Sequence, residues 1–238
     1  GWGRRLIHGV IQYTRHYHPW HLWIEPRNPH EQLKFPTGWR GDGIIARVST
    51  PQLARRLAAL RVPVVNTSAI EIQGVDFPRV TTDVQAAAQL AAEHFLDRGF
   101  RNFGYFGTLH SSYLVKHQSA FMKAVSAAGC RCQVYPTSPA VGWEAQQARL
   151  AQWLKQLPKP VAVLSWALQG LMVLDVCYSI HLNVPEEVAV LAGDEDDLLC
   201  NAAIPPLSGI AIPSEMMGGE AARILHHLMT SGKRHAPS

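Results

Sequence analysis

Short apolar runs alternate with amphipathic helical stretches along almost the whole chain. Runs such as Val161–Ser165 and Val188–Leu191 are bounded by turn-forming residues, which is typical of buried strands. Stretches with apolar residues at helical spacing separate them, beginning with residues 4–17. Strand–helix alternation of this kind favours parallel sheets in doubly wound α/β layers. Because more than ten alternating strands and helices are too many for a single sheet and its covering helices, we expect two α/β subdomains.

The order of the expected elements fixes the expected domain boundaries. The sequence predicts helices over 4–17, 51–60, 84–98, 117–128, 143–156, 168–181 and 215–229, and strands over 21–25, 43–46, 63–66, 80–82, 102–107, 133–135, 161–165, 188–191 and 207–212. Asp83 is a good N-cap for the helix at 84–98, and Gly99 stops that helix. We therefore expect an N-terminal subdomain of residues 1–99 with 213–230, a C-terminal subdomain of residues 100–212, and a polar tail at 231–238.

Composition narrows the class of protein. A hydrophobic fraction of 47% over 238 residues allows a substantial core. The formal charge of +4 comes from scattered Lys and Arg, so it does not by itself indicate a nucleic-acid surface. The four Cys show no zinc spacing, which predicts reduced thiols in a cytoplasmic protein. No secretory signal or apolar stretch of about 18 residues stands out, so we expect no membrane partner. The chain begins with Gly1 and not with Met, which suggests a fragment of a longer chain.

A turn of small residues follows the expected strand at 188–191 and leads into a run of four acids, Asp194 to Asp197. Open α/β sheets bind their ligands just past the carboxyl ends of their strands. Carboxylate oxygens there could accept hydrogen bonds from sugar hydroxyls or hold a cation. The same acids could instead begin the next helix, because acids favour helix N-termini. Asp194, the first acid after the strand, is the stronger ligand candidate, and Glu195 to Asp197 fit the start of a helix.

Three passages carry a resemblance to a known family. They are Thr81–Asp83 with Ala86–His94 and Asp97–Gly107, then Val184–Asp194, and then Pro206–Ile210 leading to Met217–Ala222. In this order they resemble the sensor domain of LacI/GalR-type transcription regulators, and the match spans nearly the whole chain. Further local clues are similar to the branch of xylose-operon regulators: Gly9–Tyr13, Gly41–Ile45, Ala151–Pro158, and Val176-Cys177 ahead of His181–Pro185.

The resemblance implies a fold and a function. The fold is that of type I periplasmic binding proteins, and a small sugar, a pentose such as xylose, would bind between the subdomains. Closure around hinges near Arg98–Arg101 and Ile212–Glu215 would reorient a homodimer and so control DNA binding through a module outside this chain. In the xylose branch that module is of the AraC type and follows the sensor. The resemblance implies no enzymatic activity and no cofactor.

The resemblance and the residue chemistry together suggest a set of ligand-contacting residues. They are Asp194, Arg4, His117, Trp2, Ser68 and Trp166. Asp194 would accept sugar hydroxyls, and Trp2 would stack on an apolar sugar face. His117 stands where the family usually has an Arg that reaches the ligand, and Trp166 stands where it often has an Asp. Structural roles remain open for each: a solvated charge for Arg4, a loop serine for Ser68, core packing for Trp166 and a surface position for His117.

Other functions have weaker support in the sequence. A periplasmic solute-binding protein for transport would share the fold, but the residues at 184–194 are similar to the regulators. An enzyme using the acids at 194–197 would need a nucleophile and base, and no GxSxG, GxxxxGK(S/T) or HExxH motif is present. His16, His18 and His21 could suggest a metal site, but they span a helix-to-strand junction and need not converge. We therefore expect no metal.

Overall fold

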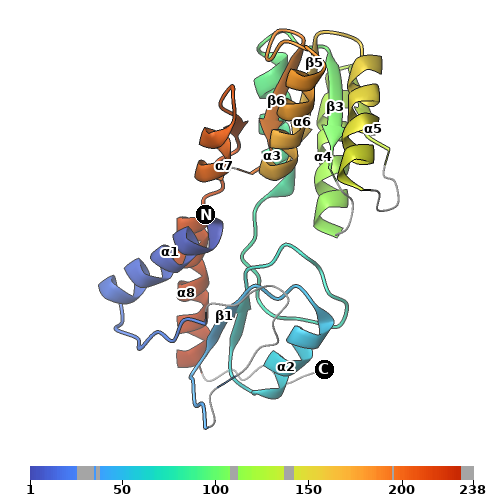
Figure 1. Ribbon diagram of the computed structural model, residues 1–238. Helices are drawn as coiled ribbons and strands as arrows, with labels where there is room; N and C mark the ends of the chain where they lie inside the picture. Colours follow the sequence, from blue (N-terminus) through green and yellow to red (C-terminus); the bar gives the residue numbers. More distant parts are fainter. Residues whose placement is uncertain (26–34, 36–37, 108–111, 137–141, 195, 232–238) are drawn as a thin grey trace. The chain divides into compact units, whose positions relative to one another are not determined.

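The computed structural model describes residues 1–238 apart from a few segments, and its parts are shown in Figure 1. The segments outside the description are 26–34, 36–37, 108–111, 137–141, 195 and 232–238. The described residues divide into two compact units. Unit 1 contains Gly1 and Thr82–Ile212, and unit 2 contains Trp2–Thr81 and Pro213–Ser238.

Unit 1 is built on a five-stranded parallel sheet with the order β4-β3-β5-β6-β7. Its strands are β3 (Asn102–Phe106), β4 (Arg131–Val134), β5 (Val161–Ser165), β6 (Val188–Ala192) and β7 (Ser208–Gly209). Its helices are α3 (Val84–Leu96), α4 (Ser112–Ala127), α5 (Trp143–Gln156), α6 (Ala167–Ser179) and α7 (Asp197–Ala202). Each crossover between neighbouring strands carries a helix, as parallel pairing requires. The predicted α/β class with parallel sheets is confirmed.

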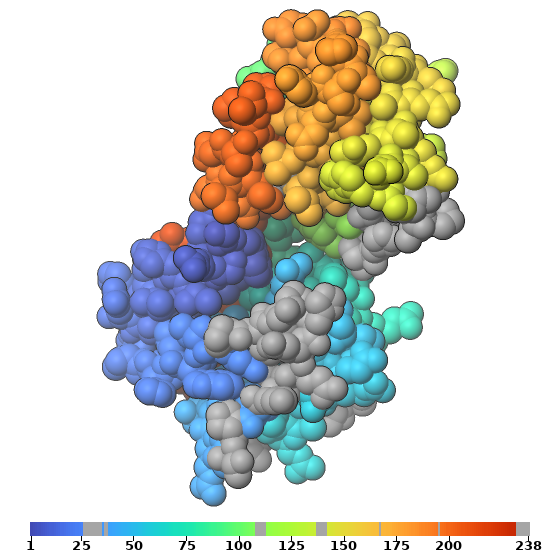
Figure 2. Space-filling model, in the orientation of Figure 1, coloured from blue at the N-terminus to red at the C-terminus, as the bar shows by residue number. Residues whose placement is uncertain are grey.

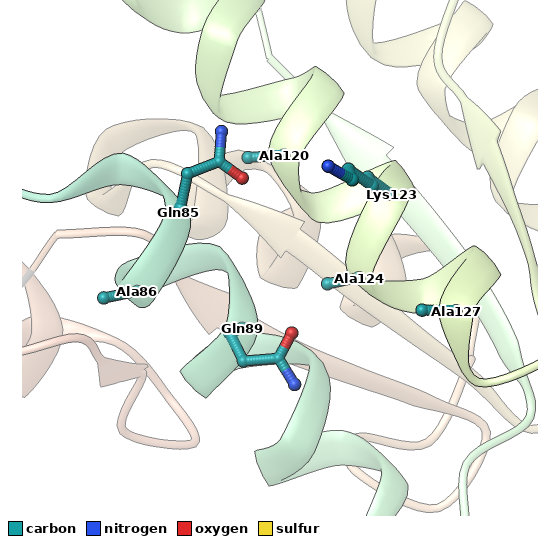
Figure 3. Close-up of a pocket in the computed structure, with 7 residues that line it drawn as sticks. All are labelled: Gln85, Ala86, Gln89, Ala120, Lys123, Ala124 and Ala127. Atoms are coloured by element: carbon teal, nitrogen blue, oxygen red, sulfur yellow. The ribbon is translucent and has the colours of Figure 1, made fainter.

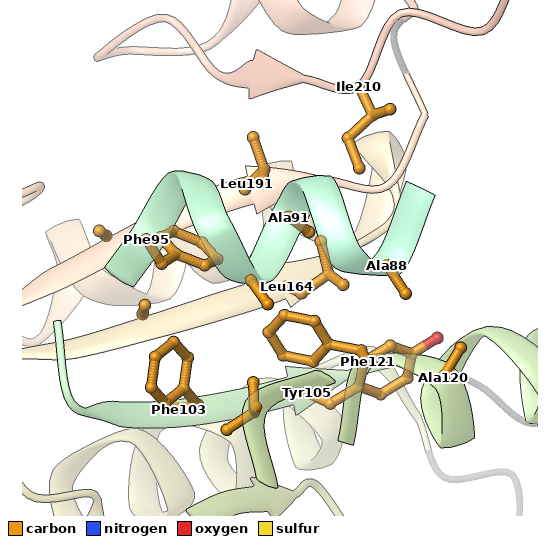
Figure 4. Close-up of a cluster of buried hydrophobic side chains, with 14 residues drawn as sticks. Ala88, Ala91, Phe95, Phe103, Tyr105, Ala120, Phe121, Leu164, Leu191 and Ile210 are labelled. Atoms are coloured by element: carbon orange, nitrogen blue, oxygen red, sulfur yellow. The ribbon is translucent and has the colours of Figure 1, made fainter. Parts of the chain in front are cut away.

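The two faces of this sheet carry separate apolar clusters. Alternate residues of β3 point to opposite sides, so that Phe103 and Tyr105 join α3 and α4, whereas Phe106 joins α5 and α6. Figure 4 shows the first cluster, in which Phe95, Phe121 and Leu164 meet Phe103 and Tyr105. Helices α5 and α6 pack on the other face of the sheet. Their residues form much of the visible surface of unit 1 in the space-filling view (Figure 2). Central strands buried on both faces explain the continuous apolar runs in the sequence.

The first division of the chain lies earlier than the sequence suggests. We expected residues 1–99 to belong to one subdomain, but the units separate between Thr81 and Thr82. The reason is α3: its Ala88, Ala91 and Phe95 are buried in the unit 1 core. The second division falls between Ile212 and Pro213. The predictions for the two ends of α3 are confirmed. Asp83 is the N-cap and accepts hydrogen bonds from two backbone N–H groups, and Gly99, after the helix, has a φ of +85°.

Unit 2 contains a small parallel sheet of β1 (Ile44–Ala46) and β2 (Val64–Asn66). Three helices pack around it: α1 (Trp2–His16), α2 (Pro51–Ala59) and α8 (Ser214–Thr230). Side chains alternate here as well. Ile44 and Val64 face the cluster of α2, whereas Ile45 and Val65 face α8.

Two glycines allow α1 and α8 to pack at very short distance. A Cβ on Gly9 would overlap the Glu215 carbonyl oxygen, and a Cβ on Gly218 would overlap the Leu6 carbonyl oxygen. Each helix therefore presents a glycine to the backbone of the other. This contact joins residues more than 200 positions apart, and it explains why the last helix belongs to the same unit as the first.

Some expected elements differ in the structure. Residues 21–25 and 80–82 form no strand, and one isolated bridge joins Asn66 to Arg79, just before the second of these segments. Helix α4 begins at Ser112 rather than near 117, and the expected strand at 207–212 is shortened to β7. Short apolar segments at the margin of a small sheet carry too little local signal to fix their pairing.

No described helix is long and apolar enough to cross a membrane. All four cysteines are free, as the sequence predicts. Burial raises the pKa of Cys132 and of Cys177 to about 12, so both thiols are protonated at neutral pH and are poor nucleophiles.

Candidate functional site

The candidate residues of unit 1 gather at the carboxyl edge of its sheet. His117 lies on α4, and its ring centroid is 4.8 Å from that of Trp166, the residue between β5 and α6. Tyr113 adds a third ring, 5.5 Å from Trp166 and 6.3 Å from His117. Tyr105, near the end of β3, approaches from the core side. The structure thus brings together two of the predicted residues, His117 and Trp166, with two tyrosines that the sequence analysis did not select.

His117 is a buried polar residue and not a surface residue. Its side chain is only 1% exposed, and its Nδ1 lies 3.4 Å from the Tyr105 hydroxyl oxygen. Its Nε2 has no hydrogen-bond partner. Burial lowers the pKa of His117 to about 4, so the imidazole is neutral at pH 7. A buried polar atom left without a partner costs about 1–3 kcal/mol, which a bound ligand atom could recover.

Tyr105 and Trp166 both contact the imidazole of His117. Burial raises the pKa of Tyr105 well above its ordinary value, and the nearby indole N–H of Trp166 opposes part of this rise. The phenol is therefore protonated at neutral pH. The indole nitrogen is buried and makes no hydrogen bond of standard geometry, so its interaction with the Tyr105 oxygen is a weak one. Trp166 is thus part of the polar cluster and is more than apolar core.

The turn after β6 closes around His117. Gly193 continues the parallel ladder by donating its N–H to the Ser165 carbonyl oxygen. A Cβ on Gly193 would lie 2.9 Å from His117 Cε1 and 3.2 Å from Nε2. The edge of the imidazole that carries Nε2 therefore faces this turn. Asp194, the next residue, is half-buried and makes interactions within the protein. It lies two residues after the end of β6.

The remaining described acids of this run serve the next helix. Asp196 is the N-cap of α7 and accepts hydrogen bonds from the N–H groups of Leu198 and Leu199. Asp197 is an acid in the first turn of α7, where it suits the helix dipole. The prediction that these two residues start a helix is confirmed. Glu195 lies outside the described residues.

A second unpartnered polar atom lies at the end of β5. Ser165 is 1% exposed, and its Oγ has no hydrogen-bond partner. A Cβ on Gly170 would lie 3.1 Å from this oxygen, so the hydroxyl points toward the first turn of α6. It is on the opposite face of the sheet from Leu164, which packs with the α3–α4 cluster.

Two of the unit 2 candidates lie near residues that follow its strands: Trp2 lies beside Arg47, which follows β1, and Ser68 follows β2 by two residues. Trp2 begins α1, and the Arg47 guanidinium lies 5.5 Å from its ring centroid. Trp2 is therefore ordered by packing, with one ring face beside a cation. Arg4 is exposed on the first turn of α1.

Ser68 has a structural role in its loop. Its side chain is buried, and its Oγ accepts a hydrogen bond from the Ile70 N–H at 3.2 Å. Asn66 Oδ1 accepts from the N–H groups of both Val48 and Ser68, which joins the loops that follow β1 and β2. The hydroxyl proton of Ser68 could still be donated to a ligand, so its predicted ligand contact stays a prediction.

Two hollows lie within unit 1, away from His117. One has a volume of about 340 Å³ on the solvent side of α3 and α4, where small residues leave space beside Gln85, Gln89 and Lys123 (Figure 3). The other has a volume of about 590 Å³ and lies at the amino ends of the strands, between Phe95, Pro160 and Leu207. Neither contains a predicted ligand residue.

Metal binding finds no support in the described part of the chain. No group of three or more His, Cys, Asp or Glu side chains there could hold an ion. His18 instead packs its ring edge to face with His226, at 4.0 Å between centroids, and His226 is hydrogen-bonded to Tyr13.

Parallel sheets with polar and aromatic residues clustered at a carboxyl edge define a class of α/β proteins that bind small ligands at strand ends. The chain belongs to the periplasmic binding protein-like domain family, whose sequence profile matches residues 92–238.

Two curated relatives are xylose operon regulatory proteins. The one from Escherichia coli strain K12 is 29% identical over 239 residues, which is 95% of this chain and 60% of that protein. The one from Haemophilus influenzae strain Rd is 24% identical over 250 residues, which is 98% of this chain and 63% of that protein. The chain thus spans about 60% of the length of these relatives.

Solved structures of regulators share the fold. A structure of the xylose-binding transcription activator xylR has a TM-score of 0.82 at 24% identity and covers 100% of this chain and 62% of its own. A LacI family transcriptional regulator from Mycobacterium smegmatis has a TM-score of 0.69 at 20% identity and covers 98% of this chain and 87% of its own. The predicted resemblance to LacI-type regulators, and to the xylose regulators among them, is confirmed.

The sequence analysis missed four residues of these clusters: Arg47, Gly193, Tyr105 and Tyr113. Arg47 directly follows β1, and Asp194 follows β6 by two residues, so the same strand-end rule could have selected Arg47. Gly193 and Tyr105 gave no such signal, because their importance depends on where the His117 ring lies after folding.

Proposed function

We propose that this chain is the effector-binding sensor domain of a bacterial transcription regulator. The observation that carries the proposal is the pair of His117 and Trp166 at the carboxyl edge of the unit 1 sheet, where Asp194 follows the end of β6 by two residues. This edge combines an aromatic surface, a buried polar atom without a partner and a carboxylate, which together suit a small polyol. The named functions of the relatives support regulation over transport or catalysis.

The effector we propose is a pentose, with xylose first. The support is the names of the relatives: the E. coli protein is a xylose operon regulatory protein, and the solved activator is described as xylose-binding. Arg4, Trp2 and Ser68 in unit 2 stay proposed ligand contacts as well. A sugar with different affinity for two conformations of the protein would shift the population between them.

The rest of the regulator is proposed on the same basis. DNA would be bound through a module outside this chain, the protein would be a cytoplasmic homodimer, and neither a cofactor nor an enzymatic step is needed. The mild formal charge of +4 agrees with a sensor that leaves DNA contact to another part of the protein.

Calorimetric titration tests the proposal. Purified protein is titrated with xylose, ribose, arabinose and galactose, and we expect saturable heat with at least one pentose. Asp194→Ala removes a carboxylate that could accept two hydroxyl donors, so we expect affinity to fall by about 100-fold or more. Asp175→Ala is the matched control, because Asp175 is exposed on α6 and outside the cluster. Absence of both heat and thermal shift with all four sugars would overturn the sugar assignment.

A further inference from the structure

Tyr105 occupies an unusual place for a polar side chain. It is completely buried, and its ring packs in the apolar cluster of Phe103 and Phe121. Its hydroxyl is at the margin of that cluster in Figure 4. From there it reaches Nδ1 of His117 at 3.4 Å. The phenol therefore connects the core of unit 1 to the candidate ligand site.

The surrounding backbone leaves Tyr105 little freedom. A Cβ on Gly107 would lie 2.9 Å from Tyr105 Cε1 and 3.4 Å from the hydroxyl oxygen. The His117 ring has Trp166 beside it and the Gly193 turn against its other edge. Glycines after two strand ends thus make space for these two rings.

The donors and acceptors around Tyr105 select one tautomer of His117. The Tyr105 hydroxyl has a single hydrogen-bond partner among the described residues, which is Nδ1 of His117. The phenolic proton then needs an acceptor, and Nδ1 of His117 is the one within reach. A neutral imidazole carries a single proton, so the proton must lie on Nε2. The opposite tautomer would leave the buried phenolic proton without an acceptor among the described residues.

We propose that Tyr105 is a positioning residue that holds His117 as its Nε2–H tautomer, so that the candidate site offers a buried hydrogen-bond donor beside Gly193. This inference rests on the proposed function for the identity of the ligand, but the tautomer does not depend on it. The donor requires an acceptor oxygen, which a sugar hydroxyl or ring oxygen supplies. A ligand group that can only donate, such as an ammonium, would leave Nε2–H unpaired.

Nitrogen-15 NMR of the imidazole rings reads the tautomer directly. In the sugar-free protein at pH 7 we expect the His117 signals to show a protonated Nε2 and an unprotonated Nδ1, with assignment by their loss in His117→Gln. In Tyr105→Phe the phenolic donor is gone, and we expect the Nδ1–H tautomer to be populated. Tyr135→Phe is the matched control, because it also removes the hydroxyl of a tyrosine. Tyr135 is half-buried and packs with Phe106 and Trp153 on the other face of the sheet.

Sugar affinity supplies the second readout. We expect Tyr105→Phe to weaken xylose binding about 5- to 10-fold, and we expect His117→Gln to cost little more when Tyr105→Phe is already present, because both changes act on one donor. Tyr135→Phe should leave affinity unchanged. A purely structural role for Tyr105 would change stability without moving the tautomer.

The two readouts separate the two proposals. A protonated Nδ1 in the wild-type protein, or an unchanged tautomer in Tyr105→Phe, overturns the positioning role whether or not xylose binds. The expected tautomers together with no sugar binding would support the positioning role and overturn the sugar assignment instead.

Discussion

Acid should destabilise this protein through one buried histidine. His117 is 1% exposed, and burial lowers its pKa to about 4 from an ordinary 6.5. Above pH 6.5 the ring is neutral in both the folded and the unfolded state. As the pH falls below 6.5, His117 becomes protonated in the unfolded chain but stays neutral in the folded protein. The free energy of unfolding therefore falls with pH until about pH 4, where the folded ring is also protonated.

The size of the effect follows from the two pKa values. Lowering the pKa of His117 to about 4 corresponds to a loss of about 3 kcal/mol between pH 7 and pH 4. At pH 5.5 the expected loss is already about 1.4 kcal/mol. These amounts are a large fraction of the 5–15 kcal/mol typical of domain stability. His94 contributes in the same direction, because burial and the nearby Arg98 lower its pKa as well, so the His117 part must be measured as a difference between proteins.

Urea unfolding at several pH values, in the wild type and in His117→Gln, isolates that difference. We expect the wild type to lose about 3 kcal/mol more than the variant between pH 7 and pH 4. Phe121→Leu is the control, because Phe121 lies one turn along the same face of α4 and has no proton to exchange. It should lower stability equally at every pH. Parallel pH curves for wild type and His117→Gln would refute the reasoning, since the imidazole would then titrate as it does in the unfolded chain.

Four further substitutions test packing and helix capping. Gly193→Ala places a methyl group against the imidazole and should cost about 1–3 kcal/mol in urea unfolding, with weaker sugar binding as well. Asp83→Ala removes the N-cap of α3 and should cost about 1 kcal/mol in the same assay, with little change in calorimetric affinity. Gly9→Ala forces a methyl group into the Glu215 carbonyl and should lower the melting temperature markedly; Gly3→Ala, whose added Cβ meets nothing within 4 Å, should instead stabilise α1 by up to about 1 kcal/mol. An unchanged melting temperature in Gly9→Ala would contradict the close helix packing.

Most of unit 1 was predictable because each of its elements carries a strong local pattern. The runs at Val161–Ser165 and 188–191 are buried on both faces and begin and end within a residue of the predictions. The predicted helix at 143–156 has the same bounds as α5. The strand predicted at 21–25 is absent because its local pattern is weak. Alternation over a few residues cannot reveal whether a partner strand is available.

The domain boundary was harder to predict, because it depends on which core receives a helix. The apolar face of α3 is made of alanines and Phe95, and such a face can pack on either sheet. The helix directly follows the N-terminal part of unit 2 in the chain, so the sequence analysis assigned it to that subdomain. In the folded protein, Ala88, Ala91 and Phe95 fill the space over Phe103. The small side chains of α3 allow it to pack closely against α4. The fit of α3 to the folded surface of a unit, which the helix sequence does not contain, therefore determines the unit in which it packs.

His117 shows why a site can be found in sequence while its chemistry is misjudged. A histidine on an amphipathic helix looks like a surface residue, and only its alignment with a ligand-contacting Arg of the family marked it. An Arg at that position would bring a permanent charge, whereas the buried imidazole is neutral at pH 7 and offers one donor at most. Its partners, Tyr105 and Gly193, come from two different strands and adjoin it only after the sheet has formed. The ligand preference of this site therefore depends on a contact between strand ends that no single segment of the sequence contains.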